Sequence, residues 1–388
     1  MRKFGGCHSM KKKAILVLTF FLSLLLLACS QTAEEKKEDK PNIEKKKQVY
    51  FNVSLATEPG EVKPKEKAKL IFSIQDSTTK DIAINDLEIV HEKPIHLIIT
   101  SEDLSFFNHI HPQPTGDGSI YEVETEFPFA GKYRFYMDYS PKSVGHRLAR
   151  LELNVSGTPQ AAVPLVVDKT DSQIVDGVKV TIKPEKPFQT NDALNLTFLL
   201  EDAKTGKPLT DIEPYLGAFA HFNIINQDHT ETLHAHPLVE AESKDARGGP
   251  EVSTRTIFPK AGLYKIWTQF QRNGKVIVAP FVINVAEGKS LETVAATTDS
   301  GVQKLKVTVS ENGYEPTNLE LKSGVPAQIA FYRVDEKNCG NEILFTELGI
   351  RKDLPLNKET VVEFTPEKDL NYEFTCGMGM LKGKVVVK

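Results

Sequence analysis

The sequence contains one pattern twice, and this repeat limits the folds that the chain can adopt. In each copy a histidine is followed thirteen residues later by a His-x-His-Pro motif. The two copies read His96 with His109-Ile110-His111-Pro112, and His221 with His234-Ala235-His236-Pro237. An aromatic segment at 127–133 also matches one at 258–264. Two related domains are therefore predicted, over residues 49–156 and 163–287.

Short runs of alternating apolar and polar residues indicate strands throughout these domains and beyond them. The clearest runs are 69–74, 133–139, 178–182, 194–199, 304–309 and 384–388. Gly, Pro, Asn and Asp separate the runs, and long apolar stretches with a helical period are absent, which is typical of all-β sandwiches. Each repeat is predicted to be an immunoglobulin-like β-sandwich. A third β domain, residues 301–388, follows a small, polar linker.

The repeated histidines are candidate metal ligands. His109 and His111 alternate by one residue, so both side chains lie on one face of a strand, and His96 lies in a neighbouring apolar run. Three imidazoles suit Zn(II), Cu(II) or Ni(II). The candidate second metal sites comprise His96, His109, His111, His221, His234 and His236. A structural role near the turns is the alternative, because no carboxylate partner is evident. His91, His146 and His229 have no repeat counterpart and are interpreted as surface residues.

The N-terminus has the pattern of an export signal. Three lysines at 11–13 precede an apolar run at 14–27, which is shorter than the about 20 residues that a membrane-spanning helix needs. The run ends in Leu26-Leu27-Ala28-Cys29, which resembles the lipobox of bacterial lipoprotein signal peptides. The resemblance implies cleavage before Cys29 and attachment of lipid to it. Residues 1–28 are then the signal peptide, and an uncleaved signal anchor is the alternative. Translation starts at Met1 or Met10.

A charged, low-complexity stretch follows Cys29 and is predicted to be a flexible tether over residues 29–48. The expected location is the cell envelope, with the chain lipid-anchored to a membrane and facing the periplasm or the exterior. The net charge of −4 gives no basic excess that would indicate binding to nucleic acid.

Sulfur ligands gather in the third domain. Beyond Cys29 the only cysteines are Cys339 and Cys376, and two of the three remaining methionines are Met378 and Met380. Three of these four sulfur residues lie in the run Tyr372-Glu373-Phe374-Thr375-Cys376-Gly377-Met378-Gly379-Met380. With this run, residues 302–388 resemble the cupredoxin-like domains of bacterial copper proteins. The resemblance implies a Greek-key β-sandwich in which a mid-chain position, matched by Cys339, and a loop between the last two strands supply the ligands.

The histidine content of this domain departs from that of ordinary blue-copper proteins. Their sites use two histidines, a cysteine and a weak axial methionine, whereas no histidine follows His236. Thiolate and thioether ligands favour Cu(I). The resemblance is closer to membrane-anchored Cu(I) chaperones of bacteria, and it implies that copper is held by Cys339, Cys376, Met378 and Met380. Two alternatives stay open, namely a disulfide between the cysteines and a core-filling role for the methionines.

These features predict a copper-binding lipoprotein for copper tolerance or trafficking. Its expected partners are a membrane, through the lipidated Cys29, and a copper transporter or another copper protein. A cupredoxin-type electron-transfer protein is the alternative, and it requires an imidazole supplied by the second repeat. An adhesive stack of sandwiches would leave the sulfur residues unexplained. Catalysis is not expected, because no nucleophile–base pair, phosphate-binding loop or full set of oxidase histidine motifs is found.

Overall fold

The computed structural model describes residues 51–76, 86–116, 118, 120–142, 144–235, 237–336 and 340–388. Regular structure in these residues consists of strands and one 3-10 turn, η1 (Thr346–Leu348). No helix in this part of the chain is long and apolar enough to cross a membrane. The predicted signal peptide and tether, with Cys29, lie outside the described residues. The all-β prediction is confirmed.

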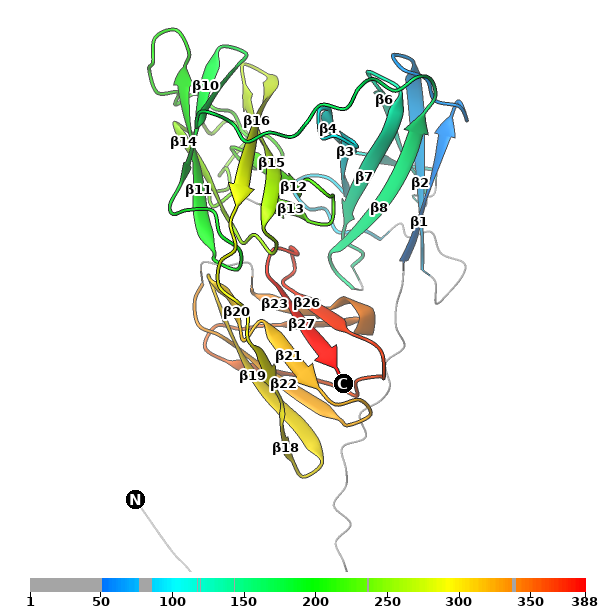
Figure 1. Cartoon of the computed structure of the whole chain (residues 1–388), viewed down its shortest axis with the longest axis vertical. Helices are drawn as coiled ribbons and strands as arrows, with labels where there is room; N and C mark the ends of the chain where they lie inside the picture. Colours follow the sequence, from blue (N-terminus) through cyan, green and yellow to red (C-terminus); the bar gives the residue numbers. More distant parts are fainter. Residues whose placement is uncertain are drawn as a thin grey trace, which may run out of the picture. The chain divides into compact units, whose positions relative to one another are not determined.

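The first repeat is a sandwich of two antiparallel four-stranded sheets (Figure 1). One sheet contains, in spatial order, β1 (Phe51–Glu58), β2 (Lys67–Asp76), β6 (Ile120–Glu126) and β5 (Gln113–Thr115). The other contains β4 (Phe107–Ile110), β3 (Ile95–Ser101), β7 (Gly131–Tyr139) and β8 (Arg147–Val155). Alternate residues of β2 are buried because successive side chains of a strand point to opposite faces. Its buried residues, including Phe72, form a core with Leu97 and Phe135 of the facing sheet.

The second repeat is also a sandwich of two antiparallel four-stranded sheets. One sheet contains β9 (Ser172–Val175), β10 (Val178–Pro184), β11 (Leu194–Asp202) and β14 (Glu251–Thr256). Its edge strand β9 pairs with β10, whereas the edge strand β5 of the first repeat pairs with β6, so this sheet differs between the repeats. The other sheet contains β13 (Thr232–Ala235), β12 (His221–Asn226), β15 (Gly262–Arg272) and β16 (Lys275–Val285), in the same order as β4, β3, β7 and β8. Leu97 pairs with Ile110 in the first repeat, and Phe222 pairs with Ala235 at the equivalent place in the second. In the sheet that contains the histidines, the repeat inferred from their spacing is therefore also a repeat of strand order and register.

The C-terminal domain is a sandwich of two mixed sheets. The larger sheet contains, in order, β17 (Thr293–Ala295), β21 (Asn318–Leu321), β27 (Lys382–Val387), β26 (Tyr372–Thr375), β23 (Glu342–Phe345) and β24 (Ile350–Asp353). The smaller contains β18 (Thr297–Asp299), β19 (Val302–Ser310), β22 (Ala327–Arg333) and β25 (Glu359–Phe364), and β20 (Gly313–Glu315) pairs with β19. Parallel pairs, β19 with β22 and β21 with β27, distinguish it from the two repeats.

An aromatic cluster fills the core of this domain next to the predicted copper loop. Phe374, in β26, is fully buried, and its ring centroid lies 5.0–5.5 Å from those of three other rings. These rings belong to Tyr314, Phe331 and Phe345. On the neighbouring strand, Gly383 packs directly against the Phe374 ring and leaves no room for a Cβ atom. The packing fixes the end of β26 at Thr375, and Cys376 is the next residue.

The two repeats contact one another through a small apolar cluster and through His229. Phe107 stacks on Trp267, with ring centroids 4.6 Å apart. The Tyr136 hydroxyl donates to Nδ1 of His229 at 2.6 Å, and Nε2 of His229 donates to the Glu102 carbonyl at 2.8 Å. His229 is buried, so its interpretation as a surface residue is wrong. Burial, its largest influence, lowers the pKa of His229, which agrees with a neutral ring that accepts at Nδ1 and donates at Nε2.

Candidate metal centre

The predicted copper loop, residues 376–381, joins β26 to β27 and is closed on Cys376 by hydrogen bonds. The Cys376 amide donates to the Leu381 carbonyl at 3.1 Å, and the Gly379 amide donates to the Cys376 carbonyl at 2.9 Å. The Leu381 amide donates to Sγ of Cys376 at 3.3 Å. Cys376 is fully buried. An N–H group directed at sulfur stabilises a thiolate, so the loop provides Cys376 with a contact that suits a soft metal ligand.

The two methionines of the loop lie at the margin of the core rather than within it. Met378 and Met380 are half-buried, and both pack against the core of the C-terminal domain. Both also line a cavity of about 670 Å³ together with Leu381 and Lys382. Their thioethers therefore line a cavity that is accessible to solvent. This position suits metal exchange better than it suits the filling of a core.

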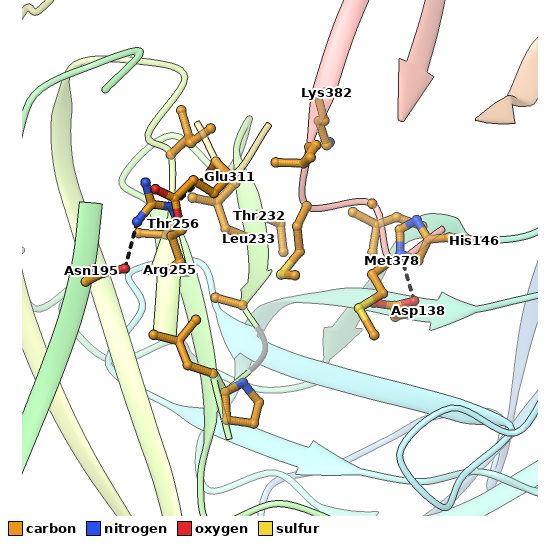
Figure 2. A pocket seen from close by; sticks show the side chains of 18 of the residues that line it. Asp138, His146, Asn195, Thr232, Leu233, Arg255, Thr256, Glu311, Met378 and Lys382 are labelled. Atoms are coloured by element: carbon orange, nitrogen blue, oxygen red, sulfur yellow. Dashed lines mark hydrogen bonds and ion pairs between the residues drawn. The ribbon is translucent and has the colours of Figure 1, made fainter. Parts of the chain in front are cut away.

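An imidazole from the first repeat lies directly against this loop. Nε2 of His146 contacts Oδ1 of Asp138 at 2.9 Å. A Cβ atom added to Gly379 would lie 2.5 Å from Nδ1 of His146, and Gly379 has a φ of +69°. Figure 2 shows Met378 next to the His146–Asp138 contact, and all three residues line the same cavity. The position therefore requires glycine for its backbone conformation and for the approach of the ring.

The Asp138 carboxylate orients His146 and affects its protonation. Burial opposes the charged ring, but the charge and hydrogen bond of Asp138 outweigh burial, so the pKa of His146 lies above its ordinary value. A carboxylate on one ring nitrogen is the usual arrangement behind a histidine that presents its other nitrogen to a metal. His146 is mostly buried, with 18% of its side chain exposed, so its interpretation as a surface residue is wrong.

The residues on both sides of His146 contact the C-terminal domain and so fix the position of the His146 segment against it. Gly145 packs against Leu344 so closely that a Cβ atom would overlap the leucine side chain. Nη2 of Arg147 donates to the Thr346 carbonyl at 3.0 Å. Burial is the largest influence on Arg147 and lowers the pKa of its guanidinium below the ordinary value. These contacts link positions about 200 residues apart, and nothing in the sequence pattern identified them.

The sulfur positions predicted from the sequence are described in part. Cys376, Met378 and Met380 lie together on the loop, and Cys376 and Met378 flank a glycine that packs against Glu342. Cys339 lies outside the described residues. The assignment of these four residues as ligands stays a prediction.

The structure also brings together the histidines of the first repeat. His96 lies in β3, His109 in β4, and His111 directly after β4. These three residues are called the histidine triad, and each offers a nitrogen within 4.8 Å of the others. Nδ1 of His96 lies 3.1 Å from Nε2 of His109. The ring of His91 lies 5.3 Å from that of His221 of the second repeat, measured between centroids. The side chain of His234, and all of His236, lie outside the described parts of the chain.

Two family models match the chain. The model of a cupredoxin-like domain matches residues 285–387. The model described as a domain of unknown function, DUF8832, matches residues 47–157 and 173–287, which together form more than half of the chain. The fold and these matches define an all-β protein whose C-terminal domain is cupredoxin-like. The chain belongs to the DUF8832 family.

Two solved structures resemble the C-terminal part of the chain. One is the metal-binding domain of the Cu(I) exporting P-type ATPase CopA of Streptococcus pneumoniae D39 with Cu(I), at 40% identity over 26% of this chain and 99% of that domain, with a TM-score of 0.25. The other is a copper-binding protein in the apo form, at 38% identity over 26% of this chain and 100% of that protein, with a TM-score of 0.24. No curated protein matches the chain.

Proposed function

We propose that this chain is an exported, lipid-anchored protein that captures Cu(I) for copper tolerance or trafficking. The ligands are Cys376, Met378 and Met380 of the loop, together with Cys339. The observation that carries the proposal is the buried Cys376 sulfur, which accepts an N–H bond beside two thioethers that line an open cavity. Soft sulfur ligands of this kind select Cu(I) over divalent ions.

The similarity of the C-terminal domain to copper proteins supports the same proposal. The domain matches the cupredoxin-like family, and the proteins with 40% and 38% identity over its length are a Cu(I)-bound domain and a copper-binding protein. The sequence of this domain contains no histidine, so its own ligands are limited to the sulfur residues. Binding and transfer of copper, rather than catalysis, are therefore the activity that we propose.

The export signal supports the proposed location. The run at 14–27 and the lipobox-like segment ending in Cys29 support a location in the cell envelope, with attachment to a membrane through lipid. A tether then gives the copper domain reach toward a membrane transporter or another copper protein, which are the partners that we propose. The direction of copper transfer does not follow from the ligand set.

His146 is the observation that favours the electron-transfer alternative. A redox-active copper site needs imidazole, and the imidazole next to the loop comes from the first repeat rather than from the second. A blue-copper site uses two histidines. Among the described residues, His146 lines the larger cavity with Met380, and His146 and His96 line the smaller one with Met378. His146 is the imidazole that packs directly against the loop at Gly379, and one such imidazole fits a Cu(I) site with a nitrogen ligand better than a blue Cu(II) site.

An anaerobic Cu(I) titration of the whole chain in detergent tests the proposal. We expect tight binding in competition with a cuprous chelator, and X-ray absorption that shows copper surrounded mainly by sulfur. A single nitrogen in this shell, lost in His146→Ala, would identify His146 as a further ligand. Absence of binding by the fully reduced chain, or a shell without sulfur, would overturn the proposal.

Gly379→Ala is expected to weaken Cu(I) binding by roughly 10- to 100-fold, the range for residues that position metal ligands. The added methyl group would overlap the His146 ring and force the loop away from its conformation between the two methionines. Gly324→Ala is the matched control, because Gly324 has a φ of +72° and open space around it. The control should carry the same backbone strain and bind Cu(I) normally. Equal affinity of the two variants would contradict the prediction.

A further inference from the structure

We propose that the histidine triad is a second metal site, made of imidazole, that binds Cu(II). The site belongs to the first repeat and contains none of the sulfur ligands of the loop. It therefore goes beyond the proposed Cu(I) function. The contacts of the rings, the spacing of their nitrogens and the cavity that His96 lines support this site.

The proton of His96 is located by a backbone carbonyl. Nε2 of His96 lies 2.9 Å from the Val90 carbonyl oxygen, which can only accept a hydrogen bond. Nε2 therefore carries the proton, and in the neutral ring the lone pair is on Nδ1. Nδ1 is the nitrogen that faces His109.

A side-chain amide of the second repeat holds the other side of the His109 ring. Nδ1 of His109 lies 2.8 Å from Oε1 of Gln269, a residue of β15, and the same oxygen accepts from Nδ2 of Asn223 at 3.1 Å. Nε2 of His109 is therefore the nitrogen that faces His96.

Nδ1 of His96 and Nε2 of His109 face one another at 3.1 Å, a distance that fits either a proton shared by the two rings or a metal ion bound by both. A shared proton needs only two nitrogens, whereas the ring of His111 also lies 5.0 Å from that of His96 and 4.7 Å from that of His109. Three convergent imidazoles favour a metal ion.

The spacing of the nitrogens fits a coordination sphere. Two nitrogens at 2.0–2.1 Å from one ion are separated by about 2.9 Å when cis in the tetragonal geometry that Cu(II) prefers and by about 3.3 Å in a tetrahedral site, and the 3.1 Å found here lies between these values. The remaining nitrogen distances, all within 4.8 Å, need only small rotations of the rings to close around an ion. His96 and His109 are 3% and 7% exposed, so an ion would be largely shielded from water.

The second repeat keeps the hydrogen bond that fixes His96. Nε2 of His221 lies 2.9 Å from the Tyr215 carbonyl, again six residues earlier in the chain. The bond orients the first histidine of each copy so that Nδ1 is directed away from the carbonyl. Two copies of this orientation are hard to explain if the histidines serve only to end a strand.

Two observations favour copper as the metal. Among divalent first-row ions, Cu(II) has the highest affinity for nitrogen ligands. His96 also lines a cavity of about 190 Å³ together with His146 and Met378, so one residue of the triad and one of the sulfur loop border the same space. This second argument rests on the proposed function, whereas the existence of the site does not.

The test is a Cu(II) titration of the whole chain carrying Cys339→Ser and Cys376→Ser, which removes the thiols that reduce Cu(II). We expect an electron paramagnetic resonance spectrum with several nitrogen couplings, and the loss of one bound ion per chain in His111→Gln. His229→Gln is the matched control, because this histidine lies outside the triad and should leave the stoichiometry unchanged. Circular dichroism checks that each variant is folded.

The spectrum of the chain with an intact triad decides the matter even where a variant fails to fold. A spectrum without nitrogen couplings, or a stoichiometry that His111→Gln leaves unchanged, would overturn the proposal. Zn(II) and Ni(II) serve as competitors, and displacement of Cu(II) by equimolar Zn(II) would overturn the assignment of copper. The double cysteine variant lacks the sulfur site, so the Cu(II) titration reports on the triad alone. The anaerobic Cu(I) titration of the unsubstituted chain tests the sulfur site separately.

Discussion

Cys376→Ser is expected to lower the affinity of the chain for Cu(I) by more than about 100-fold. Changes to residues that only position metal ligands cost about 10- to 100-fold, and this substitution removes the thiolate itself. A serine hydroxyl is a hard donor that keeps its proton near neutral pH, so it does not replace a soft thiolate on Cu(I). The measurement is an anaerobic competition titration with a cuprous chelator.

The loop itself should survive this substitution. The Leu381 amide, which donates to Sγ of Cys376, can donate to the serine oxygen instead, so no buried donor is left unsatisfied. Met137→Leu is the control, because this buried methionine belongs to the core of the first repeat. The control should bind Cu(I) normally. Normal binding by Cys376→Ser would mean that the loop is not the copper site.

Phe374→Ala is expected to lower the free energy of unfolding of the C-terminal domain by about 3–5 kcal/mol, the usual cost of deleting a fully buried phenylalanine. The ring contacts three other aromatic rings, and Gly383 leaves space for it on the next strand, so its removal creates a cavity that the strands cannot easily close. Calorimetry of the whole chain measures this change as a shift of the unfolding transition of the C-terminal domain to lower temperature.

Phe72→Ala separates stability from copper binding. Phe72 is equally buried, but it belongs to the core of the first repeat. We expect a similar loss of stability there with little change in the transition of the C-terminal domain. Phe374→Ala should also weaken Cu(I) binding, because β26 ends at Thr375, directly before Cys376 begins the turn of the loop. A C-terminal domain of unchanged stability in Phe374→Ala would contradict the packing described here.

Local patterns accounted for the strands and for the groups of candidate ligands. The alternating run at 133–139 lies in β7, and the run at 194–199 lies in β11, because burial of one face of a strand imposes a period of two. The sequence pattern grouped His96 with His109 and His111, and the structure brings the three together, with His96 on the strand paired with that of His109. These predictions needed only neighbours in sequence or within one hairpin.

The features that the sequence did not reveal depend on contacts between distant segments. His146 was set aside because it has no repeat counterpart, but its position follows from the packing of Gly145 and Arg147 on the C-terminal domain. His229 is buried because it bridges the two repeats through Tyr136 and Glu102. Periodicity within one segment carries no information about such contacts, and a single histidine has no spacing from which a role can be inferred.

The cavity that His96 and Met378 share has a kinetic consequence. One ion confined to about 190 Å³ is at a local concentration of several molar, far above that of a dilute chelator in solution. A copper ion that leaves the proposed sulfur site or the proposed histidine triad through this cavity therefore meets the other site many times before it escapes. The residence time of copper on this protein would then exceed the residence time on either site alone, and it would depend on how fast the cavity opens.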